Sequence, residues 1–247
     1  MTKQRTIKKA TSLSGVGLHT GKVVTLTFNP APENHGHKFQ RVDLSGQPIV
    51  NADVSRVIST TRGTTIKSDE AQVSTIEHVL SALVGLGIDN ILMTIDGPEV
   101  PILDGSAFHF VKALSEAGAE DQEADREYFE ITEPITYRDE ATGAELMALP
   151  HDGFEVITMI DFNSKVLGQQ YAQLYSLDDY EKEIAPCRTF VFLHEVEALF
   201  SQNLIKGGDL DNAIVIADRP VEQEELDNLA TKLGKPSIKI DKEGILN

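Results

Sequence analysis

Two adjacent ionisable residues, Glu77 and His78, lie in the stretch STIEHVLSAL at residues 74–83. Carboxylates and imidazoles are the side chains most used for proton transfer, and imidazole is also the commonest metal ligand. At helical spacing the neighbouring apolar residues form one core-facing stripe, Ile76, Val79, Leu80, Leu83 and Val84. Apart from the pair itself, the side chains on the opposite face are small. This would let another element or a ligand approach closely.

A purely structural interpretation of this pair is also open. Ser74 followed three residues later by Glu77 matches a capping box, in which Glu77 satisfies a backbone N–H at the start of the helix. On this interpretation His78 is an ordinary surface or core histidine.

Three further stretches carry polar groups suited to chemistry. The segment LSGVGLHTGK at residues 13–22 presents His19 on a glycine-rich loop, which is either a tight hairpin or a place where His19 approaches an anionic group. Its glycine spacing fits neither a P-loop nor a dinucleotide fingerprint. The segment CRTF offers Thr189, whose hydroxyl could donate to a developing oxyanion or simply belong to a strand. In PILDGSA we expect Asp104 or Ser106 to cap the following helix.

Composition sets broad limits on the class of protein. The net charge of −17 disfavours a nucleic-acid partner, because phosphate binding needs a basic surface. No run approaches the roughly 20 apolar residues that span a bilayer, and the basic N-terminus leads into no signal core. The single cysteine, Cys187, permits no internal disulfide and suits a reducing compartment. These features predict a soluble, cytoplasmic protein.

The pattern of elements predicts an α+β fold in two lobes. Each lobe begins with strands and continues with helices packed on one face of its sheet. We expect the first lobe over residues 1–118, an acidic linker over 119–127 and the second lobe over 128–247. Strands are predicted at 22–28, 90–96, 128–137, 144–149, 154–162, 187–193, 212–217 and 237–241, with residues 128–162 as a meander; helices are predicted at 75–86, 106–118, 194–203 and 221–234.

In order and approximate spacing, six stretches resemble the UDP-3-O-acyl-N-acetylglucosamine deacetylases, the zinc-dependent enzymes of lipid A biosynthesis in Gram-negative bacteria. They are LSGVGLHTG, TIEHVLSAL, GIDN, PILDGSA, CRTF and IKGGDLDNAIV. The resemblance covers essentially the whole chain, and the ordered set is more specific than any one motif. It implies two lobes of similar topology, with the active site in the cleft between them.

The resemblance also implies roles for individual residues. His78 would be a Zn²⁺ ligand, and Glu77 would be the general base for the attacking water. Thr189 would stabilise the oxyanion, Phe190 would pack against the substrate, and His19 would lie near its UDP-sugar part. The passage for the acyl chain would be formed by the segment that holds Val196, Leu199, Phe200, Leu204, Ile205, Gly208 and Leu210, although plain core packing is the alternative for its apolar members.

The chain departs from the family at the metal site. Family members complete it with an H-x-x-x-D pair on a late helix and use a further histidine as general acid, yet no histidine follows His194 here. The resemblance therefore implies that the remaining ligands lie beyond Asn247 and that the chain is a C-terminally truncated piece of a longer protein. Some relatives are fused to a 3-hydroxyacyl-ACP dehydratase domain. We expect the 247-residue piece alone to hold zinc poorly and to be inactive.

Two other hypotheses compete with the enzyme. A non-catalytic module that binds a nucleotide sugar or an acyl chain would explain the missing histidines. An acidic structural protein would explain the charge but not the ordered motifs.

Overall fold

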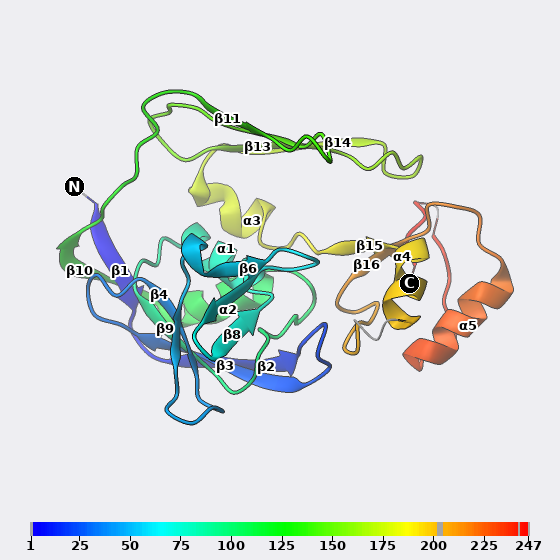
Figure 1. Cartoon of the computed structure of the whole chain (residues 1–247), viewed down its shortest axis with the longest axis horizontal. Coiled ribbons are helices and arrows are strands. Elements are labelled where there is room, and N and C mark those ends of the chain that lie inside the picture. The colour runs from blue at the N-terminus through cyan, green and yellow to red at the C-terminus, as the bar shows by residue number, and fades with distance from the viewer. Residues whose placement is uncertain (1, 202–204, 242, 247) are drawn as a thin grey trace.

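The computed structural model describes residues 2–201, 205–241 and 243–246 of the 247-residue chain. In Figure 1 the first half of the chain forms one body, two hairpins run along its upper side, and the last elements lie at the end opposite the N-terminus. The arrangement is α+β, as predicted, with helices packed against several sheets.

The main sheet of the first half has five strands in the order β2-β3-β9-β4-β5. All of its neighbouring pairs are antiparallel except β4 and β9, which are parallel. Side chains alternate along β3, where Val24, Leu26 and Phe28 are buried. The strands are β2 (Thr11–Val16), β3 (Val23–Pro30), β4 (His37–Arg41), β5 (Ile49–Asn51) and β9 (Ile91–Ile95).

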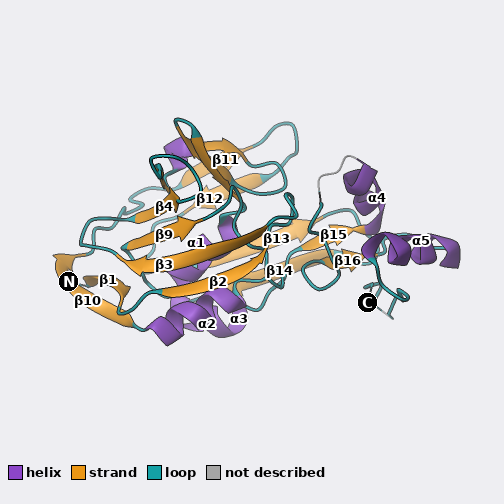
Figure 2. Ribbon diagram, turned by 90° about the horizontal axis from the view of Figure 1, so that it is seen from below, coloured by secondary structure: helices purple, strands orange, loops and turns teal. Residues whose placement is uncertain are grey.

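Two helices share a hydrophobic core with this sheet (Figure 2). Helix α1 (Glu77–Gly85) contributes Val79 and Leu83, and α2 (Phe108–Ala117) contributes Phe110 and Leu114. A second, three-stranded sheet leads into α1. Its members are β6 (Val57–Ser59), β7 (Thr65–Ser68) and β8 (Ala71–Ser74), and it follows a short 3₁₀ turn at Val54–Arg56.

The acidic segment predicted as a linker is a strand instead. Strand β10 (Ala119–Asp125) pairs antiparallel with β1 (Lys3–Ile7). Opposite charges lie across this pair, with Lys3 Nζ 2.9 Å from Asp125 and Arg5 Nε 3.4 Å from Asp121. The basic N-terminus thus gives the acidic segment a partner strand, and the segment belongs to the first half.

The middle of the chain forms two separate hairpins rather than the predicted meander. Strand β11 (Ile135–Arg138) pairs with β12 (Glu145–Ala148), and β13 (Val156–Asp161) pairs with β14 (Gln169–Leu174), a strand that the sequence did not indicate. Strands β12 and β13 do not pair with each other. Both hairpins expose large apolar side chains, among them Leu146 and Met159.

The last part of the chain has its own small core. Strands β15 (Phe190–Phe192) and β16 (Ile214–Ile216) pair in parallel, and α4 (Leu193–Ser201) and α5 (Gln223–Leu233) pack with them. Helix α5 ends at Gly234, whose φ of 65° makes it a left-handed cap. The strand predicted at 237–241 is not formed; Ile240 makes only an isolated bridge to Leu246.

The two cores do not divide the chain at the predicted linker. Leu174, Tyr180 and Ala185 belong to the first core, although they were assigned to the second lobe. Tyr180 lies on α3 (Tyr180–Glu183), after a 3₁₀ turn at Leu177–Asp179, and its hydroxyl is 2.7 Å from Ser81 Oγ on α1. Among the described strands, a sheet of more than three strands occurs only in the first half of the chain. The two parts therefore differ in the number and order of the strands in their sheets.

Membrane-spanning helices were sought among the described residues. None of the helices there combines the length and the apolar character that crossing a bilayer requires.

Candidate active site

Glu77 is the first residue of α1, and its carboxylate bonds to the chain just before β7. Its Oε2 accepts a hydrogen bond from the backbone N–H of Thr64 at 3.0 Å. The capping box is not formed, because Ser74 belongs to β8 and the residue preceding the helix is Ile76, which caps nothing with its side chain. Thr75, with φ 58°, turns the chain between strand and helix. Glu77 therefore occupies the first helical position instead of the third.

His78 is half-buried on the same turn of α1. Burial lowers the pKa of its imidazole from the ordinary 6.5, while the negative charges of Glu77 and Asp104 act in the opposite direction. The effect of burial is the larger, so the neutral imidazole is favoured. In this form the ring has a lone pair available for a metal or a proton. The role of His78 as a metal ligand stays a prediction.

The loop that carries His19 reaches the same place from between β2 and β3. A Cβ atom built on Gly63 would lie 3.3 Å from Glu77 Oε1 and 3.7 Å from His19 Nε2. The two side chains therefore approach one point from different elements. Gly63 has φ 155°, so this close approach uses the conformational freedom of glycine. His19 Nε2 also lies 3.2 Å from the carbonyl oxygen of Arg62.

Thr189 is held against the turn at Asp104 and Gly105. Its backbone N–H donates to the Gly105 carbonyl at 2.8 Å, and the carbonyl of Thr189 accepts from Ile214 at the start of β16. The neighbouring Asp104 carboxylate acts on the His78 imidazole. The Asp104–Gly105 turn thus connects the first-half histidine with the later threonine.

The expected cap of α2 lies in the same segment. Asp104 Oδ1 accepts from the Ser106 hydroxyl at 2.7 Å, and Ser106 Oγ accepts from the N–H of Phe108, the first residue of the helix. Residue Ala107 occupies the position just before the helix and makes no side-chain bond.

Phe190 belongs to an aromatic cluster at the start of the second core. Its ring centroid is 5.4 Å from that of Phe162, from the end of β13, and 5.7 Å from that of Phe192, both in edge-on geometry. Phe192 in turn stacks on His194 at 5.6 Å. The ring of Phe190 is only half-buried and keeps an accessible side.

The segment predicted to hold an acyl chain lies partly in the second core. Val196 is 4% exposed, and Ile205 and Leu210 pack against the same cluster, which agrees with the core alternative for these three. Leu199 is half-buried on α4, and Gly208 bonds to the Ile205 carbonyl. Leu204 lies outside the described residues, as does the side chain of Phe200.

Comparison with known proteins identifies the family. The sequence pattern of the UDP-3-O-acyl N-acetylglycosamine deacetylases, also called LpxC, matches residues 4–229. The chain belongs to the LpxC family. A bifunctional enzyme LpxC/FabZ of Bacteroides thetaiotaomicron is 47% identical over 247 residues, and one of Chlorobaculum tepidum is 44% identical over 247 residues. The UDP-3-O-acyl-N-acetylglucosamine deacetylase of Methylococcus capsulatus is 44% identical over 219 residues.

These LpxC relatives differ in how much of their length the chain covers. It aligns over 100% of its own length with 54% of the Bacteroides enzyme, and over 99% with 53% of the Chlorobaculum enzyme. The match with the Methylococcus deacetylase covers 87% of the chain and 71% of the relative. The chain thus spans about half the length of the bifunctional LpxC/FabZ relatives.

The fit of a metal ion to this member of the LpxC family can be tested on its donor groups. Among residues 2–201, 205–241 and 243–246, no group of three or more His, Cys, Asp or Glu side chains is placed to hold one. His78, with Asp104 near it, supplies a donor but not a complete coordination shell. The described residues alone therefore do not make a zinc site.

Three residues of this site escaped the sequence analysis. Glu99 is 1% exposed and bonds to the His19 loop, and Arg188 donates to the Asp104 carbonyl at 2.7 Å and to the Leu210 carbonyl at 3.0 Å. Gly207, rather than Gly208, contacts the His19 loop by donating to the Leu18 carbonyl. For Glu99 the sequence signal was the PEVPILDG stretch, where this acid is enclosed by prolines and aliphatic residues.

Proposed function

We propose that the chain is the deacetylase portion of an enzyme that hydrolyses the N-acetyl group of UDP-3-O-(3-hydroxyacyl)-N-acetylglucosamine. This is the committed step of lipid A biosynthesis, carried out in the cytoplasm of a Gram-negative bacterium. Membership of the LpxC family and the names of the relatives support the proposal. The structural observation that supports it best is the approach of Glu77 and His19 to one point at Gly63.

The residues of the chain divide the work of such a hydrolysis. Glu77 accepts the proton of the water that attacks the acetamide carbonyl, and the Thr189 hydroxyl donates to the oxyanion that forms. His19 contacts the UDP-sugar, and Phe190 offers its accessible ring face to the substrate. The apolar passage for the acyl chain includes Leu199, which is half-buried on α4, and Gly208. Each buried methylene of an acyl chain there contributes up to about 0.8 kcal/mol.

His78 is proposed as one ligand of a Zn²⁺ ion whose other ligands lie beyond Asn247. A zinc ion there would polarise the carbonyl and make water more acidic. The proposal includes a fused 3-hydroxyacyl-ACP dehydratase domain in the complete protein, supported by the bifunctional relatives. On this proposal the 247-residue chain alone binds zinc weakly and does not turn over substrate.

Acetate release by the complete protein tests the proposal. We expect Glu77→Gln to lower kcat by about 10²–10⁴-fold, the usual contribution of a positioned general base. Glu70→Gln is the matched control, because Glu70 is an exposed acid in the turn between β7 and β8. Equal rates in wild type and Glu77→Gln would refute the assigned base.

A binding module without turnover is the second candidate, favoured by the incomplete metal shell among the described residues. The same assay separates the two, since a binder retains UDP affinity but releases no acetate in any variant.

A further inference from the structure

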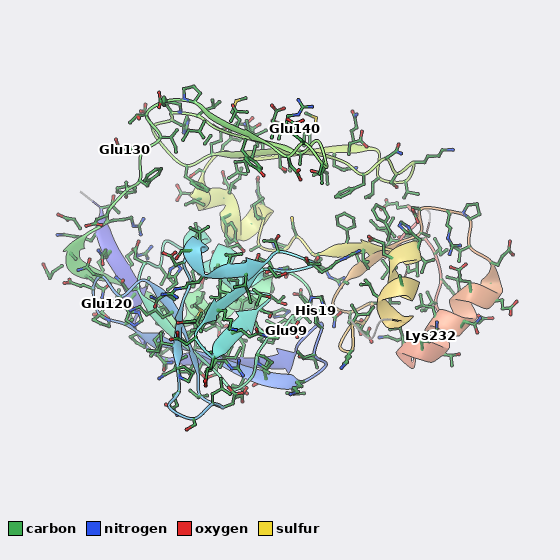
Figure 3. All side chains as sticks on the ribbon, in the orientation of Figure 1. His19, Glu99, Glu120, Glu130, Glu140 and Lys232 are labelled. Atoms are coloured by element: carbon green, nitrogen blue, oxygen red, sulfur yellow. The ribbon has the colours of Figure 1, made fainter. Side chains whose placement is uncertain are left out.

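Glu99 is a buried acid whose surroundings consist of hydrogen-bond donors. Its Oε1 accepts from the His19 N–H at 2.9 Å and from the Thr75 hydroxyl at 3.1 Å. Its Oε2 accepts from the Thr20 N–H at 2.9 Å and from the Thr20 hydroxyl at 2.8 Å. Figure 3 shows His19 and Glu99 close together where the loop after β2 approaches the later part of the chain.

These contacts join two elements that the site needs. The two carboxylate oxygens of Glu99 together hold the loop that carries His19. The bond from the Thr75 hydroxyl also fixes the residue that connects β8 to α1, two positions before Glu77. The backbone of Glu99 is fixed in turn, because it forms a parallel bridge with Ser74 and its neighbour Val100 donates to the Ser74 carbonyl at 3.0 Å. A single carboxylate therefore connects the loop with the start of the helix.

Two local conformations depend on this connection. Thr75 has φ 58°, an uncommon value for a β-branched residue, and its bond to Glu99 helps to offset the strain. Gly17 leaves the space for the carboxylate, because a Cβ there would lie 2.5 Å from Glu99 Oε2.

We propose that Glu99 is a positioning residue that holds His19 and Glu77 at their common point beside Gly63. It is 1% exposed, and it acts through the His19 loop and through Thr75. The kinetic part of this proposal rests on the proposed function, whereas the structural part does not.

The variant Glu99→Gln tests the proposal through hydrogen-bond polarity. A glutamine has the same shape, but one of its two arms is an NH₂ group that cannot accept. A threonine hydroxyl can rotate to accept from that group, whereas a backbone N–H cannot. Whichever way the amide is turned, either the His19 N–H or the Thr20 N–H loses its acceptor.

Residue-resolved amide hydrogen exchange on the 247-residue chain gives the first measurement. We expect exchange at whichever of His19 and Thr20 loses its acceptor to become about tenfold faster in Glu99→Gln, the effect of one lost buried bond. Exchange at Thr64 should also accelerate, because its N–H is held by the Glu77 carboxylate. Acceleration at His19 or Thr20 without any change at Thr64 would reduce Glu99 to a support of one loop and overturn the proposal.

Asp96→Asn is the matched control. It changes an exposed carboxylate to an amide in the turn that precedes Glu99, where Asp96 Oδ1 accepts from the Thr25 N–H at 2.7 Å, away from the site. It should leave exchange at His19 and Thr64 unchanged. An equal acceleration in this control would mean a general loss of stability and would contradict the proposal.

Kinetics of the complete protein give the second measurement. Glu99→Gln should raise KM through His19 and lower kcat through Glu77, with a combined loss of about tenfold in kcat/KM. Unchanged kcat and KM would overturn the positioning role. If the wild-type protein releases no acetate, the proposed function fails, and the exchange measurement alone decides the role of Glu99.

Two milder variants apply if Glu99→Gln does not fold. Thr20→Val removes a bond to one carboxylate oxygen and Thr75→Val removes a bond to the other. We expect Thr20→Val to accelerate exchange mainly at Thr20, and Thr75→Val mainly at Thr64. The absence of both effects would overturn the proposal.

Discussion

The first half of the chain and the part after residue 127 bury their apolar side chains very differently. In the first half, strands, α1 and α2 enclose fully buried residues such as Phe28, Phe39 and Phe110. In the segment that runs from residue 128 through the hairpins β11–β14, Phe129 is 90% exposed, Met159 is 72% exposed and Tyr171 is 61% exposed. The second core is small and lies around α4 and α5.

This difference indicates that stability resides mainly in the first half. Glu77, His78, His19 and Glu99 all lie on that half, which fixes them through its core and its hydrogen bonds. Thr189 and Phe190 come from the later part and depend on contacts that dock it, such as Tyr180 on α1 and Arg188 on the Asp104 turn. We therefore expect a rigidly held Glu77, the proposed general base, beside a less firmly held Thr189, the proposed oxyanion donor.

The largest effect is expected from truncating one side chain in each core. Phe110→Ala removes a ring that contacts Phe28 edge-on at 6.4 Å and should destabilise the chain by about 3–5 kcal/mol. Leu229→Ala on α5 should cost about 2–5 kcal/mol, but only for the second core. Phe110→Ala should accelerate amide hydrogen exchange in both β3 and α5. Leu229→Ala should accelerate exchange in α5 alone.

Phe129→Ala is the control for this pair, because its side chain is almost fully exposed and should change stability by no more than about 0.5 kcal/mol. If Leu229→Ala accelerated exchange throughout β3, the two parts would unfold as one unit and the comparison would fail.

A smaller effect is expected at the contact between α1 and α3. A Cβ on Gly85 would collide with the ring of Tyr180, so Gly85→Ala should displace α3 and cost about 1–3 kcal/mol. We expect lower kcat with intact exchange protection in β3 and β9, because the docking of the later part is disturbed while the main sheet is kept.

Ser81→Ala is the matched variant on the same face of α1. It removes only the 2.7 Å contact with the Tyr180 hydroxyl and should cost about 0.5–1.5 kcal/mol. A Gly85→Ala protein as stable and active as wild type would show that α3 does not hold the later part in place.

The first half should also lose stability in acid. Burial lowers the pKa of His37 below its ordinary 6.5, and its Nε2 lies 2.6 Å from the Ile88 carbonyl. The unfolded chain therefore binds this proton at a higher pH than the folded chain. The contribution of His37 to the free energy of unfolding is complete above about pH 6.5 and decreases as the pH falls below that value.

Denaturant unfolding at pH 7.5 and pH 5.5 checks this direction. His37→Asn should reduce the fall between the two values, because it removes the imidazole whose pKa is lowered by burial. An undiminished fall in His37→Asn would assign the pH dependence to other groups.

The smallest effect is expected for the ion pair between the two parts. Arg62 Nη2 lies 2.7 Å from Glu195 Oε1, and both side chains are partly exposed to solvent. A double-mutant cycle with Arg62→Ala and Glu195→Ala should give a coupling energy of about 0.2–1 kcal/mol, decreasing with salt. A coupling well above this range would make the pair a main link between the parts.

The sequence predicted those features that depend on local pattern. Helix α1, with its adjacent acid and imidazole, and helix α5 follow from helical spacing. The capping box failed because Thr75 adopts a left-handed conformation stabilised by Glu99, which lies 24 residues away. The acidic strand β10 was missed because its partner charges are at the other end of the first half.

The candidate site was predictable only in part for the same reason. The ordered motifs named Glu77, His78, Thr189 and His19, since they are short and locally distinctive. Glu99 and Arg188 act through contacts between distant segments, and neither a period nor a spacing in the sequence reports such contacts. The hairpin pairing of β11–β14 likewise depends on which strands meet rather than on strand propensity.

The central claim is that the base of the first half and the hydroxyl of the later part act on one reaction. It is tested most directly by kcat/KM for acetate release in the complete protein with Glu77→Gln, Thr189→Val and the double variant. We predict losses of about 10²–10⁴-fold and 10²–10³-fold for the single variants, and a combined loss smaller than their product. Full activity in either single variant would contradict the claim.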